Sequence, residues 1–241
     1  RITLPGQEED PLGPERLFAI LEEAVPRPDE TVLLTTDDLQ RRREVIERAW
    51  DQVRRWLWAH VSQEERAAAA YIRGQAEVTP LHLMCKLNNP PADIVSDIVQ
   101  AAPEVCGWAD AHGWLPLHHA CANGASTEVL QVLTTANPDS KVVQDNQNRT
   151  PLHFYATRNA DNPNAMAANV ELLSDTGAAE LPDRNGMLPM HYACAYGTTP
   201  LVLKVLANAY PESLFAKENK GRTPMHLAMV NAHRDASPGV L

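Results

Sequence analysis

The sequence predicts an all-α solenoid built from stacked helix-turn-helix units. A short motif of threonine or leucine, then proline, then leucine or methionine, then histidine occurs five times. Its histidines, 36, 35, 38 and 35 residues apart, are His82, His118, His153, His191 and His226. Apolar residues recur at helical spacing between the motifs. A unit of about 35 residues is too small to bury a core alone, so these units must stack on their neighbours.

Each motif predicts the start of a helix. Proline suits the first helical turn because its φ is fixed and its missing N–H is not needed there, and a threonine before it can cap the free amides. Thr79, Thr150 and Thr223 fit this rule. Leu115 and Leu188 do not, so these two helices should lose a side-chain cap worth about 1 kcal/mol, which apolar contact with a neighbouring unit offsets.

A second helix is expected in each unit. Val129, Leu130 and Leu133 illustrate the apolar stripe that such a helix must bury against its neighbours. Three of these helices should end at proline-containing turns, namely Ala102-Pro103-Glu104, Asn137-Pro138-Asp139 and Tyr210-Pro211-Glu212. Residues 159–164 lengthen the third unit, and we expect a longer loop there.

The motif and its flanks resemble the ankyrin repeat, in which an acidic residue and a glycine precede Thr-Pro-Leu-His. Asp110, Asp145, Asp183 and Glu218 stand five residues ahead of the proline step, and Gly113, Gly186 and Gly221 hold the glycine, which Asn148 replaces once. The resemblance covers residues 75–241 and implies short hairpin loops between units. The implied units are 75–110, 111–146, 147–183, 184–218 and an incomplete 219–241. The proline-containing turns resemble a variant that is frequent in algal ankyrin-like arrays.

The N-terminal third is expected to cap the array. Residues 1–36 are rich in proline and predict an extended surface arm, with at most a short helix over residues 15–24. Residues 37–74 predict two capping helices, the first starting near Asp37 and the second capped by Ser62 and ended by Gly74. Three tryptophans of the first helix cannot all face inward, so one of them should be exposed or covered by the arm.

The fifth unit predicts only a first helix, from Thr223 to about Asn231. A solenoid should not end on a bare apolar face. We therefore expect the native chain to continue beyond Leu241, or another subunit to cover this end.

Composition and charge exclude several classes of function. The net charge of −10 and the pI near 5.3 argue against a general nucleic-acid or anionic-membrane binder. No apolar run approaches the length of a membrane span, and the start of the sequence shows no signal-peptide pattern. No catalytic, phosphate-binding or metal-binding motif is present, so we expect no enzyme activity, no cofactor and no metal.

The histidines and cysteines have structural explanations. In ankyrin repeats the motif histidine is hydrogen-bonded within its turn and to adjacent backbone, and this resemblance implies the same here. Cys85, Cys121 and Cys194 each stand three residues after a motif histidine, at a small core position. Equivalent positions in neighbouring units are about 8 to 10 Å apart, too far for a disulfide. Free thiols predict an intracellular, reducing compartment, with the cytoplasm first.

The resemblance also implies a partner-binding surface at the hairpin tips and inner helices. The twenty positions that match it in the second to fifth units hold five basic and no acidic residues, although residues 75–241 hold ten basic and sixteen acidic ones. We therefore expect an acidic, partly apolar protein segment as partner, with arginines and lysine pairing its carboxylates and Trp114, Met187 and Tyr196 as apolar anchors. The predicted site residues are His112, Trp114, Asn123, Gln147, Arg149, Arg158, Arg184, Asn185, Met187, Tyr196, Lys220 and Arg222.

Three classes of function remain open from the sequence. The first is a non-catalytic scaffold or adaptor that recruits partners through the concave face. The second is a fixed accessory subunit of a large assembly. The third is a regulatory array joined to a catalytic domain outside this sequence.

Overall fold

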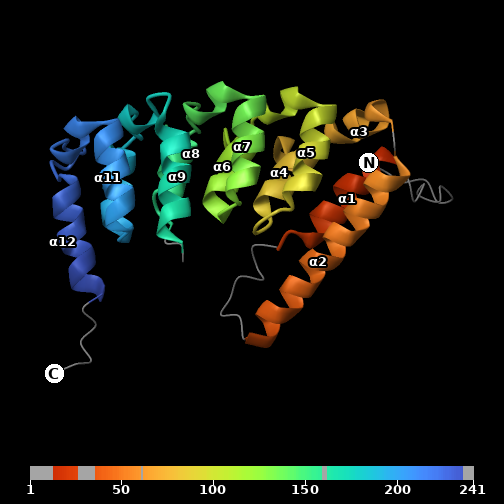
Figure 1. Ribbon diagram of the computed structural model, residues 1–241, viewed down its shortest axis with the longest axis horizontal. Helices are drawn as coiled ribbons and strands as arrows, with labels where there is room; N and C mark the ends of the chain where they lie inside the picture. The colour runs from red at the N-terminus through yellow and green to blue at the C-terminus, as the bar shows by residue number, and fades with distance from the viewer. Residues whose placement is uncertain (1–12, 27–35, 61, 159–161, 236–241) are drawn as a thin grey trace.

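The structure is a computed structural model, and it describes residues 13–26, 36–60, 62–158 and 162–235. These residues form twelve α-helices, short 3₁₀ turns and loops, with no strand among them. Figure 1 shows the helices side by side in a row, with α2 leaning away at the N-terminal end. The predicted all-α solenoid is confirmed. No helix in the described part of the chain has the length and apolar character that crossing a bilayer requires.

The helices after residue 79 form two layers. The inner layer consists of α4 (Pro80–Lys86), α6 (Pro116–Asn123), α8 (Pro151–Tyr155), α10 (Pro189–Tyr196) and α12 (Pro224–Asp235). The outer layer consists of α5 (Ala92–Ala101), α7 (Thr127–Ala136), α9 (Pro163–Ser174) and α11 (Pro200–Ala209). Each helix packs against the next of its own layer and against its partner in the other layer. One continuous apolar core therefore runs through the stack.

The inner helices begin at the motif prolines, as predicted. At every start the imidazole Nδ1 lies 3.0–3.2 Å from the backbone nitrogen of the residue before proline, and accepts its N–H. This cap does not need a threonine. Leu115 and Leu188 lack the hydroxyl and are buried instead, which agrees with the expected apolar compensation.

The motif histidines also join neighbouring units. In His82, His118 and His153 the Nε2 atoms lie 3.1, 3.2 and 3.0 Å from the carbonyl oxygens of Trp114, Arg149 and Met187, each in the following unit. The Nε2 atom of His191 is buried and has no hydrogen-bond partner among the described residues. Because Nδ1 accepts and Nε2 donates, each ring is neutral with its proton on Nε2. The structural reading of these histidines is confirmed. Burial lowers the pKa of His82, His118 and His153 to about 4, which keeps them neutral.

The N-terminal arm contains the short helix that the sequence allowed. Residues 14–24 form a full helix, α1 (Pro14–Ala24), that buries Leu17, Ile20, Leu21 and Ala24 against α2 (Thr36–Ala59), α3 (Gln63–Ala70) and α4. The sequence allowed a short helix over residues 15–24, and the structure adds that this helix is buried, because these four apolar residues at helical spacing give it a face to bury. The rest of the predicted arm, residues 1–12 and 27–35, lies outside the described residues.

The capping helices follow the sequence in most respects. Trp50 and Trp56 are buried and Trp58 is 88% exposed, as the spacing requires. Ser62 caps α3 by accepting the N–H of Glu65. Gly74 does not end a helix, because α3 stops at Ala70. A Cβ on this glycine would overlap the ring of Phe18, so Gly74 is the contact point for α1.

The cysteines and the last helix complete the fold. All four cysteines are free thiols. Helix α12 runs to Asp235, one turn beyond the expected end near Asn231. Its Met225, Met229 and Val230 are more than half exposed, so the described residues leave one side of this helix uncovered.

Candidate partner-binding surface

Four acidic residues shape the hairpin turns, which span residues 110–114, 145–149, 183–187 and 218–222. One Asp145 oxygen accepts the backbone N–H groups of Gln147 and Arg149, both at 2.8 Å. Asp110 and Asp183 hold their own turns in the same way. At the opposite corner a residue with positive φ, such as Asn148 at 60°, closes the turn. Asn148 therefore adopts the left-handed backbone that replaces the motif glycine.

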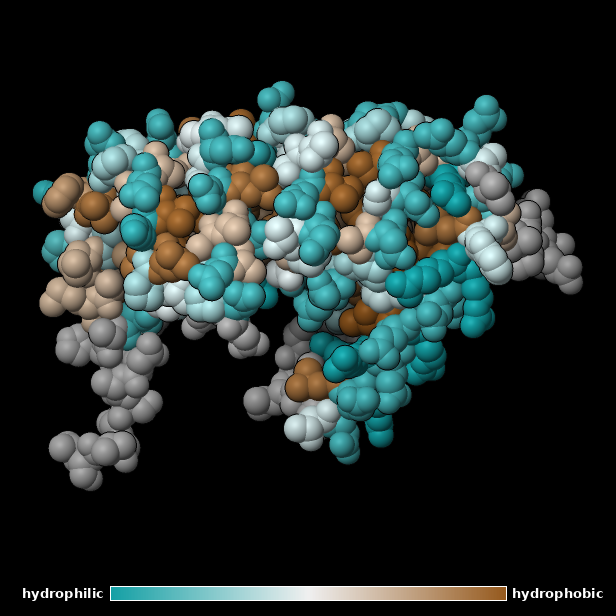
Figure 2. Space-filling model, viewed as in Figure 1, coloured by the Kyte–Doolittle hydropathy of each residue, from teal (hydrophilic) through white to brown (hydrophobic). Residues whose placement is uncertain are grey.

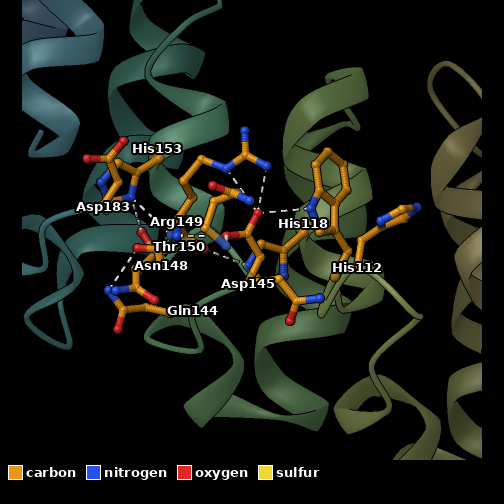
Figure 3. Close-up of polar contacts among 12 residues, drawn as sticks. His112, His118, Gln144, Asp145, Asn148, Arg149, Thr150, His153 and Asp183 are labelled. Carbon is orange, nitrogen blue, oxygen red and sulfur yellow. Dashed lines mark hydrogen bonds and ion pairs between the residues drawn. The ribbon is translucent and has the colours of Figure 1, made fainter. Parts of the chain in front are cut away.

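The second oxygen of each aspartate binds a side chain. Asp110 accepts from His119 at 3.0 Å, and Asp183 accepts from the Tyr192 hydroxyl at 2.8 Å. Asp145 accepts from the Trp114 indole at 3.0 Å and from two nitrogens of Arg149 at 3.0 and 2.8 Å. Figure 3 shows the Asp145 carboxylate between these donors. The negative charge of these three carboxylates is therefore balanced by donors within the array.

The pKa shifts agree with this geometry. Burial alone would raise the pKa of Asp110, but the hydrogen bond from His119 and those from the turn amides lower it to about 2. The same opposition leaves the pKa of Asp145 below its usual range, with Arg149 as the chief donor. Burial lowers the pKa of His119 more than Asp110 raises it. The pair is therefore a neutral imidazole donating to a carboxylate.

The hairpin turns are tied to one another through their backbones. Ala111, Asn146, Arg184 and Asn219 each donate their N–H to a carbonyl of the preceding unit, at 2.9–3.1 Å. Asn146 and Asn219 add a side-chain bond to the same neighbour. The tips are thereby held in a regular row, one per unit, and their side chains form a preorganised surface.

A hollow of about 550 Å³ lies between the second and third hairpin turns and the inner helices. We call it the inner hollow. It gathers five of the predicted site residues, together with Lys86 and His119, which the prediction missed. Lys86 was missed because only the second to fifth units were searched, and His119 because only the motif histidines were followed. The five predicted residues are His112, Trp114, Asn123, Gln147 and Arg149.

Trp114 forms one wall of the inner hollow, although it is not a free anchor. Its ring centroid lies 4.4 Å from Phe154 and 4.8 Å from His119. The Arg149 guanidinium lies 4.6 Å from the Phe154 centroid, within cation–π range. The indole is half-buried, and its N–H already binds Asp145. Trp114 can therefore offer a partner ring surface but no hydrogen bond.

The other predicted residues lie outside the inner hollow, some bound within the fold and some exposed. Arg222 donates to Glu218 at 3.0 Å, as Arg149 donates to Asp145 at 2.8 Å, so both guanidinium groups already bind a carboxylate of their own turn and leave only part of their edge accessible. Each acid stands four residues before its arginine, and this spacing could have revealed the pairing. The exposed residues make few or no described side-chain contacts: Arg184, Asn185, Tyr196 and Lys220. Met187 is half-buried, and its carbonyl accepts from His153.

Arg158 has a structural contact of its own. Its Nη1 lies 2.8 Å from the carbonyl oxygen of Ala122, in the preceding unit. The guanidinium lies against Gly124, where a Cβ would overlap it. Gly124 also has a φ of 71°, which ends α6. Arg158 therefore closes the junction of two inner helices and is not a free partner-binding residue.

Replacing Gly124 with alanine should destabilise the chain by about 2 to 3 kcal/mol. Left-handed backbone costs about 1 to 2 kcal/mol without glycine, and displacing Arg158 costs about 1 more for its lost hydrogen bond. Gly177→Ala is the matched control, since Gly177 has a φ of 86° with nothing within 4 Å of its added Cβ. Urea unfolding of both variants measures the difference. Equal losses would show that Arg158 moves away at no cost.

Comparison with known proteins places the array in a family. A family model described as ankyrin repeats in three copies matches residues 81–175, and one described as ankyrin repeats in many copies matches residues 172–228. The two matches together cover all five motif histidines and all four hairpin turns.

Three similar proteins have identities below a third. The chain is 27% identical to the "Probable 26S proteasome regulatory subunit p28" of Saccharomyces cerevisiae over 47% of this chain and 49% of that protein. It is 28% identical to "Ankyrin repeat protein nuc-2" of Neurospora crassa over 52% and 12% of the two chains. It is 27% identical to the human "Transient receptor potential cation channel subfamily A member 1" over 55% of this chain and 11% of that protein. The matches thus span about half of the first relative and about a tenth of the others.

Proposed function

The chain belongs to the ankyrin-repeat family, and we propose that it is a non-catalytic scaffold that binds another protein through its hairpin tips and inner helices. The regular row of hydrogen-bonded hairpin turns supports this proposal. Such a row holds side chains of four units in fixed positions before any partner arrives, which lowers the entropy cost of binding.

The partner is an acidic segment with apolar anchors. This preference for an acidic partner rests on the burial of the negative charges that line the inner hollow. Asp110 and Asp145 line it, yet their side chains are only 2% and 1% exposed and are fully hydrogen-bonded. Lys86 and the guanidinium edge of Arg149 remain partly accessible. A partner therefore meets positive charge beside the Trp114 ring, which favours a carboxylate next to an apolar side chain.

The surface continues toward the C-terminal units. Arg184 and Lys220 are exposed, with no side-chain hydrogen bond or ion pair in the described part of the chain. Tyr196 is 61% exposed and is the best-placed apolar anchor of the fourth unit. These residues, rather than the bound Arg149 and Arg222, supply the cationic contacts to a longer partner segment.

Charge reversal tests this function. Lys86→Glu and Arg184→Glu, together, should weaken binding of acidic peptides selected from a displayed library against the unmodified chain by about 100-fold, since two rim pairs become repulsive. Arg149 is left unchanged because reversing it would break the Asp145 pair. Lys204→Glu, on the exposed side of outer helix α11, is the control for a single charge reversal. Unchanged affinity in the double variant, measured by fluorescence anisotropy, would refute this mode of binding.

A second candidate is a fixed accessory subunit of a large assembly. The yeast relative that supports it is named as a probable proteasome regulatory subunit. A third is a regulatory array within a larger protein, which the match to a small part of a human channel supports. Size measurement of the native protein in a cell extract separates them, because a subunit elutes with its assembly and an adaptor does not. Four free thiols support a reducing, cytoplasmic compartment in either case.

A further inference from the structure

A second hollow lies at the N-terminal end, between α2, α3 and α5. Its volume is about 360 Å³. Leu57 and Ile94 are buried at its base, and Trp58 forms one wall. An apolar base beside an aromatic wall suits one large apolar side chain. We call this site the Trp58 hollow.

Trp58 is unusual among the tryptophans of α2. It is 88% exposed, whereas Trp50 and Trp56 are buried, and its ring contacts no other aromatic ring among the described residues. Figure 2 shows a mostly hydrophilic surface over this helix. Tryptophan is among the residues that most often dominate interface energies. An uncovered indole at the edge of a hollow is therefore positioned to bind.

Charged groups at the rim of the hollow determine which charge a partner should carry. Arg54 lies 3.6 Å from Asp93, and Arg66 lies 3.5 Å from Asp97. Arg66 is also fixed by the carbonyls of Leu57 and His60, at 2.9 and 2.8 Å.

Arg55 is exposed, one turn before Trp58, and makes no ion pair in the described part of the chain. The hollow thus has three arginines against two aspartates, a net charge of +1. This positive charge does not attract an apolar side chain by itself, but it attracts a carboxylate next to that side chain in the partner.

We propose that the Trp58 hollow is a second docking site, which binds a partner segment with a large apolar side chain next to a carboxylate. The site is separate from the inner hollow. It lies against α5, in the outer layer, whereas the inner hollow is lined by hairpin turns and inner helices. The chain would then hold two segments at once, through different faces.

Binding of two labelled peptides tests the proposal. The probes are fluorescein-labelled peptides with a central leucine-phenylalanine pair, flanked by glutamates in one and by lysines in the other. The glutamate peptide should bind the unmodified chain, and Trp58→Ala should weaken it about tenfold or more, because the wall of the hollow is lost. Arg55→Glu should weaken it as well. Phe215→Ala removes an aromatic that is 81% exposed at the other end of the array, and should change nothing.

Five further outcomes would overturn the proposal. Absence of glutamate-peptide binding, equal binding of the lysine peptide, or an equal loss in Phe215→Ala overturns the proposal. Light scattering of the unmodified chain and of Trp58→Ala is the second test. If the unmodified chain is a dimer and Trp58→Ala is a monomer, the hollow serves self-association and the proposal fails. Lys86→Glu should leave this binding intact. A loss there would assign the peptide to the inner hollow instead.

Discussion

The free energy of unfolding should fall steeply as the pH drops from about 6.5 to 4, and the array should unfold near the lower value. His82, His118 and His153 have pKa values lowered by burial from 6.5 to about 4. Between these two values the unfolded chain binds the protons and the folded chain does not. Stability is therefore complete above the unfolded pKa and is lost as the pH falls through this window.

The magnitude is large because the three histidines act in the same window. Each contributes a slope of about 1.4 kcal/mol per pH unit between its two pKa values, so three contribute about 4. Over the whole window the loss is about 10 kcal/mol, which is comparable to the total stability of a domain, about 5 to 15 kcal/mol. The aspartates do not share the window, since the pKa of Asp110 falls to about 2.

Thermal unfolding at a series of pH values checks this expectation. His153→Gln should lower stability at pH 7.5 but reduce the slope by about 1.4 kcal/mol per pH unit, because one proton-binding group is gone. His226→Gln is the control, since His226 is exposed at the end of the array. A slope that is the same in His153→Gln and the unmodified chain would contradict the histidine explanation.

The sequence was most informative where a contact is local and repeated. A proline at the first helical position and an imidazole three residues after the cap fix each other within one turn, so five copies predicted five helix starts. The junction between units was predictable for the same reason. The family resemblance alone implied it, and His82, His118 and His153 each repeat it.

The sequence was less informative where packing overrides composition. Five prolines within residues 1–28 suggested an extended arm with at most a short helix, yet the spacing of Leu17, Ile20 and Leu21 was sufficient for a buried helix. The sequence also did not show that Arg149, Arg158 and Arg222 make hydrogen bonds within the fold. A buried carbonyl or carboxylate is stabilised by a hydrogen bond from a fixed guanidinium. Arginines near such acceptors therefore donate to them within the fold.

Asp145→Asn should destabilise the protein by about 3 to 5 kcal/mol, the usual cost of removing one member of a buried ion pair. The carboxylate accepts from two turn amides, the Trp114 indole and the Arg149 guanidinium. An amide at this position has one oxygen. If that oxygen keeps the turn amides, its NH₂ group faces the indole and guanidinium, so donors meet donors.

Urea unfolding measures the loss, with Glu171→Gln as the control, because Glu171 is an exposed acid on α9 whose replacement should stay within about 0.5 kcal/mol. Arg149→Ala completes the argument. Its side chain is 28% exposed, so its removal alone should cost less than Asp145→Asn, and the two losses should not add. Additive losses would mean that Asp145 stabilises the turn through its backbone contacts alone. In that case Arg149 would be free to pair a partner's carboxylate, as the sequence first suggested.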